Sequence, residues 1–327
     1  MYIKSTIRMP MHPRPIPYGP ISIVSAMHRV GVLVACLFPA LAWGASIESD
    51  AAHLARALEW LLSPISGAAD HNPSTGTYLH GRLMVLAWGI LVPVGILLSR
   101  FYKVTPGQDW PRVLNNPFWF MSHRAIEYGA GVLMLAAVAV IALEDPGPPW
   151  RSFHAGMGWC VVIVGWLQLL SSHLRGAMGG PAHPRTRVPL RNWQWSEVPG
   201  AADSSGPRLD WAGDHFNMSR TRVVFEYLHK VFGYGLLAFS VLTLVTGLLA
   251  ADALNWMWVV LILWWICCTA VFIVLQRQGR AIDCYQAIWG VNEALPGNRM
   301  KPIGWWGIRR YTSNNVADAP WPRRPNK

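Results

Sequence analysis

The sequence has 327 residues, of which 52% are apolar and 14% are charged, and its formal net charge is +11. A soluble domain carries roughly 25% charged residues, so this composition excludes an ordinary soluble enzyme and predicts a membrane protein. The basic residues gather in loops and in the C-terminal tail, so we expect no nucleic-acid partner. The five cysteines form no Cys-x-x-Cys pair, which argues against a zinc site and against a thioether-linked cofactor.

Residues 1–45 are predicted to be an N-terminal extension that ends in a signal peptide. A short basic start at 27–29, an apolar run and a stretch with small residues at 42–45 together are typical of a secretory signal. The run is short for a membrane span, which needs roughly 20 residues, and a retained first helix is the alternative. Both interpretations place residue 46 outside the cytoplasm. Residues 46–78 are expected to form an extracytoplasmic amphipathic segment, which suits the outer membrane surface.

Five apolar runs are long enough to cross a bilayer. We expect helices over residues 79–102, 123–143, 153–174, 227–250 and 255–275. The predicted fold class is therefore an all-α membrane protein. It is an antiparallel transmembrane helix bundle of five helices, or of six if the N-terminal segment is retained.

Lysine and arginine predict the orientation of the bundle. They are concentrated in the loop at 103–124, the long loop at 175–222 and the tail at 277–327, whereas the opposite connections hold only Arg151. The positive-inside rule places the three rich segments in the cytoplasm, with the C-terminus. We take residues 79–276 as one transmembrane domain in a bacterial inner or plasma membrane. The tail is given no role beyond contact with a partner or a surface.

Four of the predicted helices carry a histidine in the first turn: His80, His123, His154 and His229. A histidine in a membrane segment is costly unless it is paired, and it is a functional candidate. His80 and His154 begin helices that run inward, so both lie near the outer face. His123 and His229 begin helices that run outward, so both lie near the cytoplasmic face. The helix directions therefore predict two histidine pairs, stacked across the membrane.

Two neutral imidazoles that face each other at one depth suit the axial ligation of a haem iron. Zinc would need three or four ligands, and no carboxylate or thiol is expected near either pair. Gly158 and Gly233 each follow a histidine by one helical turn and would leave room for a porphyrin. The alternative is a set of four structural histidines at the interface. His173 is the substitute ligand should His123 not serve, and His28 is available only if the first segment is retained.

The motifs around these histidines resemble the cytochrome b561 family, and most closely its ferric-reductase-type transmembrane domain. The resemblance covers about residues 78–275 and rests on His80-Gly81-Arg82-Leu83-Met84 with the run from Trp88 to Gly95, on His154-Ala155-Gly156-Met157-Gly158, and on His229-Lys230-Val231-Phe232-Gly233-Tyr234. No DOMON domain, which elsewhere precedes such helices, is recognised. The resemblance implies a four-helix di-haem core with two haems b. His80 and His154 would ligate one haem, and His123 and His229 the other.

The resemblance also implies an oxidoreductase that carries electrons across the membrane, reducing ferric chelates or exchanging electrons with quinone. The alternative is a haem-bearing membrane anchor subunit of a separate dehydrogenase or oxidoreductase, docked to a redox partner protein. A transporter is a third possibility and predicts purified protein without haem.

Charged residues beside the ligands are candidate cofactor-binding groups. Arg82, Arg124 and Lys230 are expected to pair with haem propionates or an anionic substrate, or else to anchor the helices at the interface. Glu127 and Glu226 are expected to pair with neighbouring cations rather than to carry protons for quinone. The remaining loop and surface histidines are expected to be solvated; they are His12, His53, His71, His183 and His215.

Overall fold

The computed structural model describes residues 47–69, 72–144, 152–182, 210–304 and 307–320. The predicted signal segment therefore lies outside the described residues, as do His12, His28, His71 and His183. The chain divides into two units at Leu58, within helix α2 (Ile47–Leu62). This helix forms where an amphipathic segment is predicted. Its placement on a membrane surface stays a prediction.

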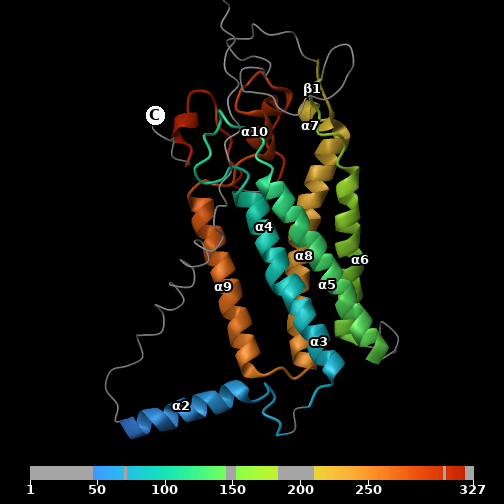
Figure 1. Ribbon diagram of the computed structural model, residues 1–327, viewed down its shortest axis with the longest axis vertical. Coiled ribbons are helices and arrows are strands. Elements are labelled where there is room, and N and C mark those ends of the chain that lie inside the picture. The colour runs from blue at the N-terminus through green and yellow to red at the C-terminus, as the bar shows by residue number, and fades with distance from the viewer. Residues whose placement is uncertain (1–46, 70–71, 145–151, 183–209, 305–306, 321–327) are drawn as a thin grey trace, which may run out of the picture. The chain divides into compact units, whose positions relative to one another are not determined.

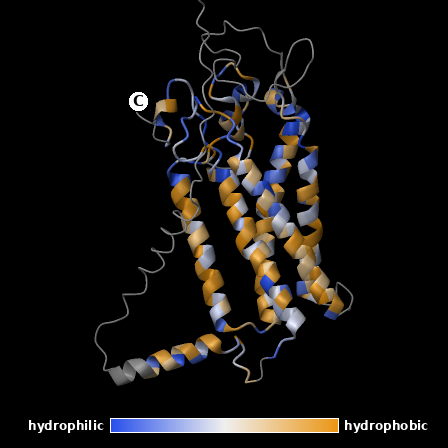
Figure 2. Cartoon of the chain, viewed as in Figure 1, coloured by the Kyte–Doolittle hydropathy of each residue, from blue (hydrophilic) through white to orange (hydrophobic). Residues whose placement is uncertain are grey.

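Five helices are long and apolar enough to cross a membrane, which confirms the predicted all-α membrane bundle (Figure 1). The first spans Thr75–Phe101 and is built from α3 (Thr75–Met84), the π-helical segment η2 (Val85–Leu91) and α4 (Val92–Phe101). The others are α5 (Phe118–Glu144), α6 (Phe153–Ser171) with its 3-10 extension η3 (Ser172–Leu174), α8 (Arg220–Ala250) and α9 (Asn255–Arg277). Figure 2 shows apolar residues along these helices and polar residues gathered near their ends.

Several of these helices begin earlier than the predicted bounds. Helix α5 begins at Phe118 rather than His123, and α8 begins at Arg220 rather than Tyr227. The Ser219 hydroxyl accepts a hydrogen bond from the Arg222 backbone N–H and caps the extra turns of α8. His229 therefore lies in the third turn of its helix and not in the first.

We call the end of the bundle where α4, α6 and α9 end, and where α5 and α8 begin, the basic end. The described parts of the loops and tail rich in lysine and arginine lie there, at the top of Figure 1. The helices alternate in direction, so the opposite end holds the end of α5, the start of α6 and the short connection between α8 and α9.

An apolar core fills the centre of the bundle. It contains Ala87, Trp88, Val92, Ala130, Met134, Val161, Val162, Leu236 and Leu244, drawn from the first, second, third and fourth spans. The Trp88 indole donates to the Met134 sulfur at 3.2 Å and lies against Gly165. Helix α9 packs outside this core on α4, and its Trp264 indole donates to the Gly89 carbonyl in η2 at 2.9 Å.

The tail packs closely at the basic end, although it carries no long periodic run. It contains α10 (Cys284–Trp289) and the 3-10 turns η5 (Pro296–Arg299) and η6 (Val316–Asp318). The long loop contributes an antiparallel pair of strands, β1 (Gly180–Ala182) and β2 (Asp210–Ala212), followed by α7 (Asp214–Asn217). Tyr285 and Trp289 of α10 are completely buried against Phe216 of α7. The tail is therefore part of the folded unit.

Candidate functional site

Two histidines face each other at the opposite end of the bundle. The rings of His80 on α3 and His154 on α6 lie 6.3 Å apart between centroids and are nearly perpendicular, at 86°. His80 Nδ1 is 2.9 Å from the Ala137 carbonyl, and His154 Nδ1 is 3.1 Å from the Thr243 carbonyl. A carbonyl oxygen can only accept, so each Nδ1 bears the proton and each Nε2 keeps its lone pair.

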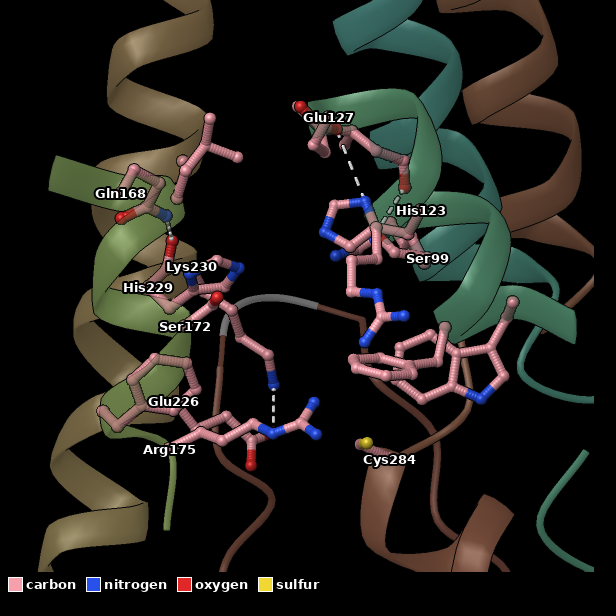
Figure 3. Close-up of a pocket in the computed structure, with 18 of the residues that line it drawn as sticks. Ser99, His123, Glu127, Gln168, Ser172, Arg175, Glu226, His229, Lys230 and Cys284 are labelled. Carbon is pink, nitrogen blue, oxygen red and sulfur yellow. Dashed lines mark hydrogen bonds and ion pairs between the residues drawn. The ribbon is translucent and has the colours of Figure 1, made fainter. Parts of the chain in front are cut away.

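A second pair lies at the basic end with almost the same geometry. The rings of His123 on α5 and His229 on α8 are 6.4 Å apart at 87°, and they enter one cavity from opposite walls (Figure 3). His123 Nδ1 is 3.1 Å from the Gly95 carbonyl, which again leaves Nε2 with a lone pair. His229 differs, because its Nδ1 is buried without a hydrogen-bond partner in the described part of the chain, and its ring stacks on Phe225.

The separation of the rings suits a shared metal ion. A metal–imidazole bond is about 2 Å long and a ring nitrogen lies roughly 1 Å from its ring centre, so two rings on one ion need about 6 Å between centroids. Within the described residues there is no group of three or more His, Cys, Asp or Glu side chains that could hold a metal ion. Each site therefore offers two imidazoles, a donor set that fits the axial positions of a porphyrin iron and not tetrahedral zinc.

A carboxylate does lie beside one pair, contrary to the sequence-based expectation. Glu127 Oε1 is 3.4 Å from His123 Nδ1, one helical turn along α5. The expected pairing of Glu127 with a lysine or arginine is not found among the described residues, and its Oε1 is buried without a hydrogen-bond partner. Glu226 does pair as predicted, with Lys230 at 2.6 Å and Arg222 at 3.4 Å.

Small residues surround the histidines unevenly. A Cβ added at Gly158 would meet nothing within 4 Å, so space is open there as predicted, whereas one at Gly233 would lie 3.3 Å from Gln168 Nε2. The close contact between a glycine of one helix and a histidine ring of another was not predicted. A Cβ at Gly247 of α8 would come within 2.7 Å of the His154 ring, so this glycine admits the imidazole of the neighbouring helix.

The basic-end pair opens into a cavity of about 860 Å³. Its walls include His123, His229 and Trp88, and six basic and two acidic side chains: Arg100, Lys103, Arg124, Arg175, Arg222, Lys230, Glu127 and Glu226. Burial lowers the pKa of Lys103 to about 8. The excess of basic groups makes this cavity suited to anionic groups, whether carried by a cofactor or by a substrate.

The predicted cofactor-binding cations lie in different surroundings. Arg124 and Lys230 line the basic-end cavity, and Lys230 is held by Glu226. Arg82 lies on the opposite-end helix α3, with its guanidinium 5.8 Å from the centre of the Tyr78 ring. His173, the substitute ligand, also lines the cavity and makes a 3.0 Å hydrogen bond between Nε2 and the Tyr128 hydroxyl.

One cavity residue was not predicted. His215 is 3% exposed, so the expectation that it is solvated is wrong. It packs on Tyr285 and Trp289 of the tail, and burial, reinforced by the charge of Arg222, lowers its pKa to about 3. A polar loop that folds against another irregular segment shows no periodic pattern, which is why the sequence gives no signal of this burial.

Comparison with known proteins finds partial similarity over the membrane helices. No protein-family model matches the chain, and no solved structure matches it significantly. Ferric-chelate reductase 1 of Bos taurus is 31% identical over 121 residues, which is 36% of this chain and 19% of the relative. A cytochrome b561, DM13 and DOMON domain-containing protein of Arabidopsis thaliana is 24% identical over 193 residues, 59% of this chain and 17% of the relative. A cytochrome b561 and DOMON domain-containing protein of the same plant is 28% identical over 137 residues, 41% of this chain and 30% of the relative.

The chain thus spans less than a third of the length of each of these relatives. The relatives are of the two kinds that the sequence motifs resemble, ferric-chelate reductases and cytochrome b561 proteins. These relatives support a cytochrome b561-type family for this chain, as the motifs around its histidines predicted.

Proposed function

We propose that the chain is an oxidoreductase that carries electrons across a membrane with two haems b. His80 and His154 would hold one haem, and His123 and His229 the other. The observation that carries the proposal is the repeated geometry of the two pairs, with centroid separations of 6.3 and 6.4 Å on helices that span a bilayer. Bound haem b supplies a one-electron redox centre.

The residues of the chain have three tasks in this proposal. Backbone carbonyls at Ala137, Thr243 and Gly95 accept hydrogen bonds from the Nδ1–H groups of three of the histidines. These bonds orient the imidazoles and make Nε2 a better electron-pair donor to a metal. The apolar core keeps water away from the region between the pairs. The cations of the basic-end cavity stabilise negative charge, either on haem propionates or on a substrate.

We also propose an orientation. The positive-inside rule puts the basic end, and with it the C-terminus, in the cytoplasm of a bacterial cell. The opposite-end pair, His80 and His154, would then lie near the outer face. Electrons would pass between a cytoplasmic or membrane donor and an outer acceptor, or in the reverse direction.

The similarity to ferric-chelate reductase 1 supports a ferric chelate as acceptor. Quinone is the second substrate to test, because the cavity of about 860 Å³ with Trp88 and other apolar residues in its wall opens at one end of the membrane bundle.

A haem-to-protein ratio combined with a redox titration tests the proposal. We expect purified protein to carry two haems per chain with two distinct midpoint potentials, and colourless protein would overturn the proposal. Turnover with a ferric chelate or a quinone then assigns the substrate. Haem-loaded protein that reduces neither compound would instead indicate an anchor subunit that serves a separate oxidoreductase.

A further inference from the structure

The position of His215 is fixed by two segments far apart in the sequence. The Trp289 indole of α10 donates to His215 Nδ1 at 3.2 Å, and the Tyr285 hydroxyl donates to the Phe216 carbonyl at 2.9 Å. On the other side, the His215 backbone N–H donates to the Ala177 carbonyl at 3.0 Å. Helix α7 is thus clamped between the tail and the end of the third span, and the His215 ring has little freedom to turn.

The Trp289 bond also decides which ring nitrogen of His215 carries the proton. An indole N–H can only donate, so His215 Nδ1 must accept and has no hydrogen. The ring is neutral because burial keeps its pKa at about 3. Nε2 therefore carries the hydrogen and is a donor at neutral pH. This Nε2 is buried and has no hydrogen-bond partner within the described residues.

An unpartnered buried donor destabilises the fold, so such groups call for an acceptor. His215 lines the basic-end cavity, the same cavity that receives His123 and His229. Lys103, Arg124 and Arg175 line it too, and none of the three has a carboxylate partner in the part of the chain that the structure describes. The charges around the cavity therefore favour an acceptor that is negatively charged.

We propose that the Nε2–H of His215 donates a hydrogen bond to an anionic oxygen of a molecule bound in the basic-end cavity. The oxygen has two chemically similar sources. One is a small organic anion with carboxylate oxygens, which exchanges with solution. The other is a propionate of the haem between His123 and His229, and only this source rests on the proposed function.

Two conservative variants separate the donor from the clamp. In His215→Asn the side-chain oxygen can take the place of Nδ1 and accept from Trp289, but the side chain is too short to reach the position of Nε2. In His215→Gln the amide nitrogen can take the place of Nε2 and donate, while the bond from Trp289 is lost. The proposal expects His215→Gln to retain the binding function and His215→Asn to lose it, although His215→Asn keeps the clamp.

The first measurement is calorimetric binding of citrate to purified full-length protein. A charged hydrogen bond contributes about 1.5–3 kcal/mol, so loss of a bond to a free anion weakens binding about tenfold or more in His215→Asn. The second measurement is the midpoint potential of the haem that remains in a His80→Ala background. Loss of a donor to a propionate leaves more negative charge beside the iron, so His215→Asn lowers this potential.

The outcomes are distinguishable. Weaker binding in His215→Asn, with near-normal binding in His215→Gln, supports the proposal and identifies a free anion. A lower potential with unchanged binding supports it and identifies the propionate. If neither quantity changes, or if both variants change equally, the proposal is overturned. Protein without haem would contradict the proposed function but would still allow the binding measurement.

Trp289→Phe provides a second route if the His215 variants fold poorly. This change keeps an aromatic ring in the buried cluster but removes the donor that fixes the proton on Nε2. Part of the His215 population would then carry its hydrogen on Nδ1, and the affected quantity should change in the same direction as in His215→Asn, by a smaller factor. An unchanged affinity and an unchanged potential in this variant count against the proposal.

Discussion

Gly247 and His154 lie in direct contact across the interface between α8 and α6. A Cβ at position 247 would be 2.7 Å from His154 Cε1 and 3.2 Å from Nδ1, closer than carbon and ring atoms approach without displacement. The same imidazole is held by the Thr243 carbonyl, one turn away on α8. Helix α8 therefore sets the position of a histidine that belongs to another helix.

Gly247→Ala should displace His154 and reduce the haem content from two per chain to about one, because the opposite-end pair can no longer hold its geometry. Alanine is a better helix former than glycine, so any loss comes from the contact and not from the helix itself. Absorbance and haem extraction measure the change. The matched control is Gly235→Ala on the same helix, where a Cβ meets nothing within 4 Å. Full haem content in Gly247→Ala would contradict the prediction.

The number of haems lost in a histidine variant should depend on how many pairs are broken and not on how many histidines are replaced. His80→Ala and His154→Ala should each lose one haem, and the double variant should lose no more than either single variant, because both residues serve one site. His80→Ala combined with His123→Ala should lose both haems, since each site is broken once. Haem-to-protein ratios of the four variants test the pairing, and a double variant of His80 and His154 that lacks all haem would refute it.

Glu226→Gln should destabilise the protein by about 3 kcal/mol, since it leaves two cations without their counter-charge in a site where Glu226 is 7% exposed. Thermal unfolding in detergent, followed by loss of helical signal, measures the effect. The control is Asp109→Asn, which removes an exposed pair with Arg112 at 3.7 Å and should cost less than about 1 kcal/mol. Equal effects of the two changes would show that burial of the Glu226 cluster contributes nothing.

Lys103 should make stability depend on pH in the alkaline range. Burial lowers its pKa from 10.5 to about 8 in the folded state. Below pH 8 the lysine is charged in both states and the cost of burying that charge is present in full. Between about pH 8 and 10.5 the folded state has lost the proton while the unfolded state keeps it, so the cost is relieved and stability rises.

Lys103→Met removes the charge and should stabilise the protein at pH 7. The stability difference between the variant and the wild type should shrink as pH rises through this range. Unfolding midpoints of both proteins at intervals from pH 7 to 10 supply the comparison. A difference that stays constant with pH would contradict the lowered pKa.

The bundle and the pairing of its histidines could be predicted because both depend on patterns that extend over whole helices. Apolar runs fix the number of spans, and alternation of direction places His80 beside His154 and His123 beside His229. The interrupted helix at Val85–Leu91 was not predicted. A π-helical segment changes the hydrogen bonding without changing the hydropathy, so the apolar run looks the same with or without it.

The surroundings of the site could be predicted less well. Gly247 meets His154 from a different helix, and such an approach depends on how two helices pack and not on spacing along either. His215 is buried by Trp289, which lies 74 residues further along the chain in a segment without periodicity. Contacts between two irregular segments leave no periodic trace in the sequence.

On the first and second spans, the apolar core around Trp88 and Met134 lies between the residue that contacts one histidine pair and the residue that contacts the other. No member of that cluster carries a titratable group, so none of them can pass on a proton that accompanies an electron. On the proposed function, an electron that crosses without a proton moves as uncompensated charge. Its passage would involve electrical work of about 2.3 kcal/mol for every 100 mV of membrane voltage, gained or spent according to direction.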